Sequence, residues 1–232
     1  MVRIPAGPAI VGSEEFPRET PRRTVQVDEF WIDVYPVTNA QFAAFIEANP
    51  GQHVPSYWLD GAPEPGTEDH PVMLAWRGAD AYARWVGKRL PTEVEWEKAA
   101  SGGDGRRFPW GDEFDASRTL TWETRAMTGA VVEPISTRPS GASPYGVMQM
   151  AGHTEEWCED DYGPHPDSTY TTVGYGRGFK VLKGGASIFT QSHARIAYRC
   201  FEGPDVDDAF FTFGGPTFRC ASSTPPISQE EQ

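Results

Sequence analysis

Two glycine-bearing runs near the C-terminus place the strongest constraint on how this chain can fold. The first is Lys-Gly-Gly-Ala-Ser at residues 183–187, and the second is Gly-Pro-Thr-Phe-Arg-Cys at residues 215–220. Glycines inside apolar, strand-like runs mark places where the backbone approaches another group closely. We therefore predict two strands separated by a long irregular loop, an arrangement that can hold a site.

Length and composition predict one loop-rich domain. The chain has 232 residues, of which 38% are hydrophobic, and it contains 24 Gly, 21 Pro and 8 Trp. This mixture favours a globule pinned by large aromatic side chains over a helical bundle. We predict a single domain over residues 1–222 and a frayed polar tail over residues 223–232.

Local patterns predict short elements of both kinds. Strands are expected within residues 2–12, 24–37 and 145–157, and helices over residues 40–48 and 77–87. A third helix should begin after Thr92, because Glu95 three residues later completes a capping box. The stretch from residue 102 to residue 143 shows no helical period, and we expect extended, turn-rich chain there.

Charge and hydropathy exclude some classes of partner. The net charge is −13, whereas nucleic acids and anionic membranes are bound by clustered Lys and Arg. The chain has no apolar run long enough to span a membrane and no signal peptide at its start, so we expect a cytoplasmic protein. The three cysteines lack zinc-type spacing and are expected to be reduced thiols.

Seven short pieces, in order along the chain, resemble the formylglycine-generating enzyme (sulfatase-modifying factor) family. They are Ile-Pro-Ala-Gly at 4–7, Tyr-Pro-Val-Thr-Asn at 35–39, Arg-Leu-Pro-Thr-Glu-Val-Glu-Trp-Glu at 89–97, Phe-Pro-Trp-Gly at 108–111, Tyr-Gly-Val at 145–147, Lys-Gly-Gly at 183–185 and Phe-Arg-Cys at 218–220. The resemblance implies an α+β domain with the C-type-lectin-like fold of this family and little regular secondary structure.

The cysteine pair of the copper-dependent members is missing. In those members two cysteines lie between the Gly-Gly strand and the Arg-Cys that corresponds to residues 199–200. Their positions fall at Phe189 and Ala194 in one register, or at Thr190 and Arg195 in the other. Neither register supplies the thiolates that bind Cu(I). We therefore expect no conversion of a Cys-x-Pro-x-Arg sulfatase peptide to formylglycine.

The resemblance leaves two functions open. The first is an oxidoreductase, an oxidase or oxygenase relative that acts on a peptide or small biosynthetic substrate without thiolate chemistry. The alternative is a non-catalytic, C-type-lectin-like module that binds a ligand or another protein. Both interpretations imply a small-molecule or peptide partner, and fold alone does not choose between them.

We predict that the loop over residues 188–199, facing residues 202–213, forms the wall of the main cleft. Within it, His193 can change charge near neutral pH and Arg195 can grip an anion, so these two are the candidate catalytic residues. We expect Arg199 to be partly buried. Candidate substrate-binding residues are Phe189, Thr190, Gln191, Tyr198, Arg199, Asp205 and Phe211. The facing segment of residues 202–213 also contains Asp207, Asp208, Phe210 and Phe213.

A metal site is the remaining hypothesis. Relatives bind structural calcium at a Gly-Asn-x-x-Glu-Trp turn, which is written Gly-His-Thr-Glu-Glu-Trp here at residues 152–157. His153 and Glu156 are therefore candidate ligands, although histidine replaces the amide oxygen that calcium prefers. Glu156 could equally be a hydrogen-bonded structural carboxylate. Iron held by His153, His193 and a carboxylate is a further hypothesis.

Overall fold

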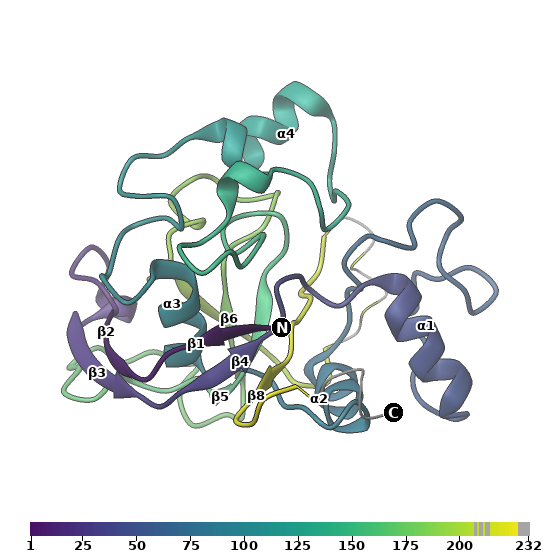
Figure 1. Ribbon diagram of the computed structural model, residues 1–232, viewed down its shortest axis with the longest axis horizontal. Helices are drawn as coiled ribbons and strands as arrows, with labels where there is room; N and C mark the ends of the chain where they lie inside the picture. Colours follow the sequence, from purple (N-terminus) through teal and green to yellow (C-terminus); the bar gives the residue numbers. More distant parts are fainter. Residues whose placement is uncertain (207, 209–210, 212–213, 227–232) are drawn as a thin grey trace.

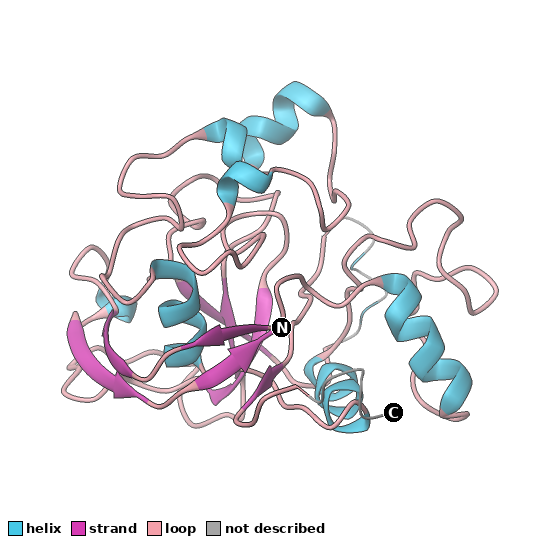
Figure 2. Cartoon of the chain, in the orientation of Figure 1, coloured by secondary structure: helices cyan, strands magenta, loops and turns pink. Residues whose placement is uncertain are grey.

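The chain forms short strands and helices joined by long loops, as Figure 2 shows. The computed structural model describes residues 1–206, 208, 211 and 214–226. The strands are β1 (Val2–Ile4), β2 (Gly7–Val11), β3 (Arg23–Val27), β4 (Phe30–Ile32), β5 (Glu156–Asp161), β6 (Lys180–Lys183), β7 (Arg199–Glu202) and β8 (Ala221–Ser222). The α-helices are α1 (Asn39–Ala48), α2 (Trp76–Trp85), α3 (Glu93–Ser101) and α4 (Trp122–Thr128), with 3-10 turns at Pro17–Glu19, Ala116–Arg118 and Pro139–Gly141.

The two ends of the chain meet in one small sheet. Strand β4 lies between β1 and β8 and pairs antiparallel with both. Its inward side chains, Phe30 and Ile32, are buried together with Ile4 of β1. Strands from the two ends of the chain therefore lie side by side.

The β2–β3 hairpin is held against α3 by backbone groups (Figure 1). The N–H of Ile10 donates to the carbonyl of Gly103, just beyond the end of α3. The N–H of Gly12, at the tip of β2, donates to the buried Glu97 carboxylate at 2.9 Å. These bonds fix where the loop after β2, residues 12–22, leaves the sheet.

The third sheet carries the glycine-rich strand at its centre. Strand β6 pairs antiparallel with β5 on one side and β7 on the other. Lys183, the last residue of β6, is fully buried, and its ammonium lies 2.8 Å from Glu97 of α3. The frame that precedes Gly184 is thus anchored to α3.

Helix α3 begins after Thr92 as its capping box predicts, and α1 lies where the helix over residues 40–48 was expected. Thr38 caps α1 and Thr92 caps α3, each in a capping box with the residue three positions on. Helix α1 packs on α2 through a buried aromatic cluster in which the Phe42 and Tyr82 rings stack with centroids 5.9 Å apart. Long loops connect these helices, which agrees with the low content of regular secondary structure that the composition predicts.

Three local predictions are wrong. Helix α4 lies in the stretch where no helix was expected, and it has only seven residues, too few for a periodic signal. Residues 145–151 form turns and irregular chain instead of a strand, with Gln149 at a φ of 57°. Residues 215–220 enter only an isolated bridge at Thr217 before β8 begins.

No helix in the described part of the chain is long and apolar enough to cross a membrane.

Candidate functional site

The loop over residues 186–199 turns back tightly onto the end of β6. Gly184 and Gly185 have φ values of 89° and 69°, in the left-handed region that glycine tolerates. A Cβ at Gly185 would lie 2.4 Å from the carbonyl oxygen of His193. Glycine is therefore required here for the loop to close on itself, as the close-approach interpretation of the sequence implies.

His193 sits between two aromatic rings. Phe189 stacks on its imidazole with centroids 4.9 Å apart and planes 21° apart, and Tyr198 meets it edge-on at 4.9 Å. The ring Nδ1 lies 3.1 Å from the Ser192 hydroxyl. Burial, together with the nearby guanidinium groups of Arg18 and Arg195, lowers the pKa of His193. Both effects favour the neutral imidazole.

Glu155 joins this group, although nothing in the sequence pattern singled it out. The Tyr198 hydroxyl lies 3.4 Å from Glu155 Oε1, and the Arg18 guanidinium lies 5.1 Å from the centre of the Tyr198 ring. Burial raises the pKa of Glu155 to about 7, and repulsion from Glu202 acts in the same direction. A carboxyl group that titrates near neutral pH is typical of functional sites.

The two arginines of the loop are held in buried ion pairs. Arg195 is 1% exposed and donates to both Glu19 oxygens at 2.8 and 2.7 Å, under the Phe16 ring. Arg199 is 2% exposed and donates to both oxygens of Glu93 at 2.8 and 2.9 Å. The burial expected of Arg199 is observed, and Arg195 is buried as well. Its guanidinium fastens the loop to residues 12–22.

The two candidate metal ligands, Glu156 and His153, contact other protein groups in this structure. Both oxygens of Glu156 accept from Arg219, at 2.6 and 2.7 Å, and one also accepts from Trp96 Nε1 at 2.9 Å. His153 is 2% exposed, and its Nε2 lies 3.4 Å from Glu133. Within the described ranges, no three His, Cys, Asp or Glu side chains gather as a metal would require. These residues fit neither the calcium nor the iron hypothesis, and Glu156 is a hydrogen-bonded structural carboxylate.

The remaining candidates divide between the loop and more distant positions. Thr190 and Gln191 are exposed on the loop, where the Gln191 N–H donates to Glu123 of α4 at 3.1 Å. Asp205 instead forms an exposed ion pair with Arg77 of α2. Phe211 is buried against Gly215. The predicted Asp207, Phe210 and Phe213 lie outside the described residues.

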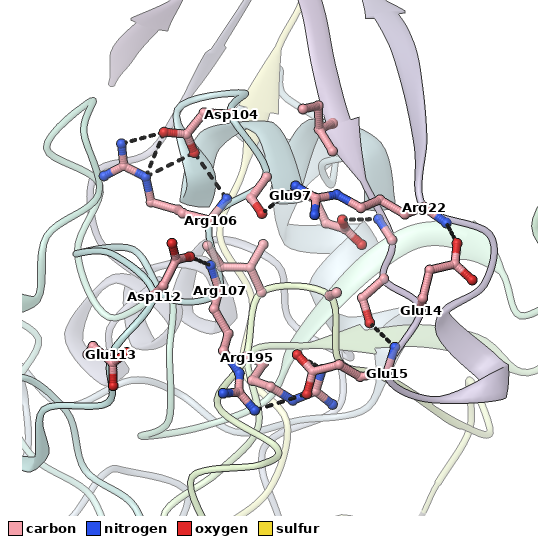
Figure 3. Close-up of a pocket in the computed structure, with 16 residues that line it drawn as sticks. Glu14, Glu15, Arg22, Glu97, Asp104, Arg106, Arg107, Asp112, Glu113 and Arg195 are labelled. Carbon is pink, nitrogen blue, oxygen red and sulfur yellow. Dashed lines mark hydrogen bonds and ion pairs between the residues drawn. The ribbon is translucent and has the colours of Figure 1, made fainter.

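A charged cavity of about 740 Å³ lies beside the loop (Figure 3). Arg195, Ile196 and Ala197 form one wall, so this part of the loop does border a cavity. The other lining residues come from residues 10–15 with Arg22, from Glu97 of α3 and from residues 104–113, and the described part of the predicted residues 202–213 contributes none. Sequence inspection missed this cavity because its walls come from segments far apart along the chain.

The fold and the loop together define the class of protein, which is a C-type-lectin-like domain of mixed helices and short strands. The chain belongs to the sulfatase-modifying factor family, since the profile of the Sulfatase-modifying factor enzyme 1-like domain matches residues 1–223. The resemblance drawn from the seven sequence pieces is thereby confirmed.

Relatives cover nearly the whole chain. It is 35% identical to the formylglycine-generating enzyme of Streptomyces coelicolor, over 95% of this chain and 88% of that protein. It is 30% identical to the inactive C-alpha-formylglycine-generating enzyme 2 of Mus musculus, over 96% and 85% of the two chains. It is 35% identical to the serine/threonine-protein kinase pkn1 of Chlamydia caviae, but spans only 37% of the length of that protein.

Solved structures agree on the fold. The structure of PvdO from Pseudomonas aeruginosa superposes with a TM-score of 0.76 at 22% identity, covering 96% of this chain and 93% of that one. The Treponema denticola variable protein 1 gives the same TM-score at 20% identity, covering 97% and 95%. At these identities the likeness shows the shared fold alone.

Proposed function

We propose that this chain is a ligand-binding member of the family, and that the loop over residues 186–199 recognises a peptide or small organic molecule without thiolate chemistry. One observation carries the proposal: at three of the four possible positions of the missing cysteines, the residue present is engaged in packing or ion pairing. Phe189 stacks on His193. Ala194 is buried against Phe108, and Arg195 is locked to Glu19.

An exposed apolar surface beside the loop supports recognition. Trp122 of α4 and Ile188 of the loop are 53% and 38% exposed. The backbone N–H of Trp122 donates to the Phe189 carbonyl at 2.8 Å, and this bond fastens the start of α4 to the loop. Apolar side chains with a few polar anchors are typical of ligand sites, and tryptophan is enriched among residues that dominate binding energy. His193 and Glu155 would supply the polar anchors.

The names of the relatives are compatible with binding as well as with catalysis. The mouse relative is called inactive, whereas the Streptomyces relative is called a formylglycine-generating enzyme. We infer that this chain, like the mouse relative by its name, is inactive as a formylglycine-generating enzyme, because its loop lacks the thiol pair.

Screening a peptide and metabolite library by ligand-observed NMR tests the proposal. Compounds bound by the unaltered chain should lose at least about tenfold in affinity in Trp122→Ala, since a central aromatic anchor contributes 2 kcal/mol or more. His193→Ala should weaken binding in the same direction. Trp85→Ala is the matched control, because Trp85 is 45% exposed on α2.

Arg195→Ala is a poor test, since it would leave Glu19 buried and unpaired and thereby destabilise the fold. The proposal fails if the bound compounds are unaffected by Trp122→Ala and His193→Ala, or if Trp85→Ala weakens them equally.

The Glu155 carboxyl favours a second candidate, in which the same site performs acid–base catalysis. A group whose pKa lies near 7 can donate and accept a proton at physiological pH. Mass spectrometry of the bound compound after incubation distinguishes the two candidates. An unchanged mass supports binding alone, and a mass change that Glu155→Gln abolishes supports catalysis.

A further inference from the structure

The charged cavity lies between the hairpin loop of residues 12–22 and residues 104–113, and Arg195 contributes to its wall. Its volume of about 740 Å³ falls within the range of about 300–1,000 Å³ that holds small-molecule ligands. Figure 3 shows carboxylates and guanidinium groups projecting from facing walls. The identity of any ligand therefore depends on which of these charges are already neutralised.

Four ion pairs at the cavity neutralise themselves, and one of them joins Glu97 of α3, which lines the cavity, to the buried Lys183 at 2.8 Å. Asp104 pairs with Arg106 at 2.7 Å along the same loop. Glu15 of the hairpin loop pairs with Arg107 at 2.9 Å, and this contact joins the two facing walls. Arg195 in the third wall is paired with Glu19. None of these pairs leaves net charge for a ligand to meet.

Four side chains at the cavity lack a partner of opposite charge in the described part of the chain. The carboxylates of Glu14 and Asp112 accept only backbone N–H groups, at 2.7 and 2.9 Å. The Glu113 carboxylate has no ion-pair or hydrogen-bond partner there. The Arg22 guanidinium contacts only the Gly105 carbonyl, at 3.3 Å. Among the described charged side chains that line the cavity, three carboxylates and one guanidinium thus lack a partner of opposite charge.

We propose that this cavity binds a small zwitterion with net positive charge, a basic amino acid or a short basic peptide. Its cationic groups meet the carboxylates of Glu113, Asp112 and Glu14. Its carboxylate meets Arg22, whose planar guanidinium matches a carboxylate in a bidentate geometry. A recess lined by one excess sign also raises the local concentration of the opposite charge. This site is separate from the surface at Trp122 and His193.

Isothermal titration of the full chain in 0.15 M salt tests the proposal, with L-arginine and the dipeptide Arg-Gly as probes. L-citrulline is the matched control ligand because it keeps the shape of arginine without the guanidinium charge. We expect saturable binding of one equivalent of at least one basic probe, and binding of citrulline weaker by at least about fivefold.

Variants locate the binding. Glu113→Gln and Glu14→Gln should each weaken the basic probe about two- to fivefold, the range for partly exposed ion pairs. Glu47→Gln makes the same change in charge on α1, away from the β2–β3 hairpin (Figure 1), and should leave affinity unchanged. The proposal is overturned if neither basic probe saturates, if citrulline binds equally well, or if the Glu47 variant weakens binding as much as the cavity variants.

Discussion

Glu155 and Glu156 are neighbours in sequence with opposite environments. The Glu156 carboxylate is 1% exposed and is fully matched by Arg219 and Trp96. The Glu155 carboxylate instead lies 3.4 Å from the Tyr198 hydroxyl, and no cation in the described part of the chain lies within ion-pair range of it. At the scale of single residues, the buried arginines are therefore held in structural ion pairs, whereas one carboxyl group beside the loop has no charged partner among the described residues.

Glu155→Gln should stabilise the folded chain at pH 8 and change little at pH 5. Burial raises the pKa of Glu155 to about 7, so the folded state keeps a proton that the unfolded chain releases. Stability from this group is complete below the unfolded pKa and is lost as pH rises toward 7. We expect a gain of about 1–2 kcal/mol at pH 8, reduced for partial solvent exposure.

Urea unfolding of both proteins at the two pH values measures this difference. A gain of the same size at pH 5 would show that the glutamine improves packing and that the carboxyl pKa is ordinary.

At the scale of elements, α3 organises the surrounding segments. Its Glu97 carboxylate accepts from the N–H of Gly12 after β2 and pairs with Lys183 of β6, and its Glu93 carboxylate pairs with Arg199 of β7. The capping box at its start is a local signal, because Thr92 and Glu95 satisfy each other's backbone N–H groups at 3.2 and 2.9 Å. A helix that forms from local signals can then present these carboxylates to distant strands.

Thr92→Ala should lower the free energy of unfolding by about 1 kcal/mol, the usual cost of losing an N-cap side chain. Thr92→Ser retains the hydroxyl and should recover most of that loss. Equilibrium urea denaturation measures both variants. If alanine and serine destabilise equally, packing of the threonine methyl group, and not the cap, is responsible.

At the scale of the whole molecule, Arg219 ties together segments from both ends of the chain. It donates to Glu156 in β5, to the carbonyls of Asp33 and Val34 after β4, and to the carbonyl of Met148. It is fully buried. The Arg219 side chain, two residues before β8, therefore links the sheet of β1, β4 and β8 to β5 and to the segment at Met148.

Arg219→Gln should destabilise the fold by about 3–5 kcal/mol, because it leaves Glu156 buried without a cation. Amide hydrogen exchange should accelerate together in β4, β8 and the residues near Met148. Arg3→Gln is the control, since the Arg3–Glu29 pair on the same sheet is 64% and 35% exposed and should contribute about 0–1 kcal/mol. Exchange confined to β8 would contradict the tie between segments.

Features that depend on neighbouring residues were predictable from the sequence. The capping box at Thr92, strands within residues 2–12 and 24–37, and the close backbone approach at Gly185 all follow from local patterns. The ordered motifs identified the family, and the loop over residues 188–199 was located without a structure. The absence of a thiol pair in that loop is a property of the sequence alone.

The roles of the buried charges were decided only by the tertiary structure. Arg195 and Glu19 lie 176 positions apart, and Arg199 and Glu93 lie 106 positions apart. No local pattern pairs them, because burial of one charge merely requires some partner and the fold selects which one. The same holds for the cavity, whose walls meet only when the hairpin loop, residues 104–113 and residues 195–197 are brought together. Sequence thus located the loop, and packing determined which of its side chains are held in buried ion pairs.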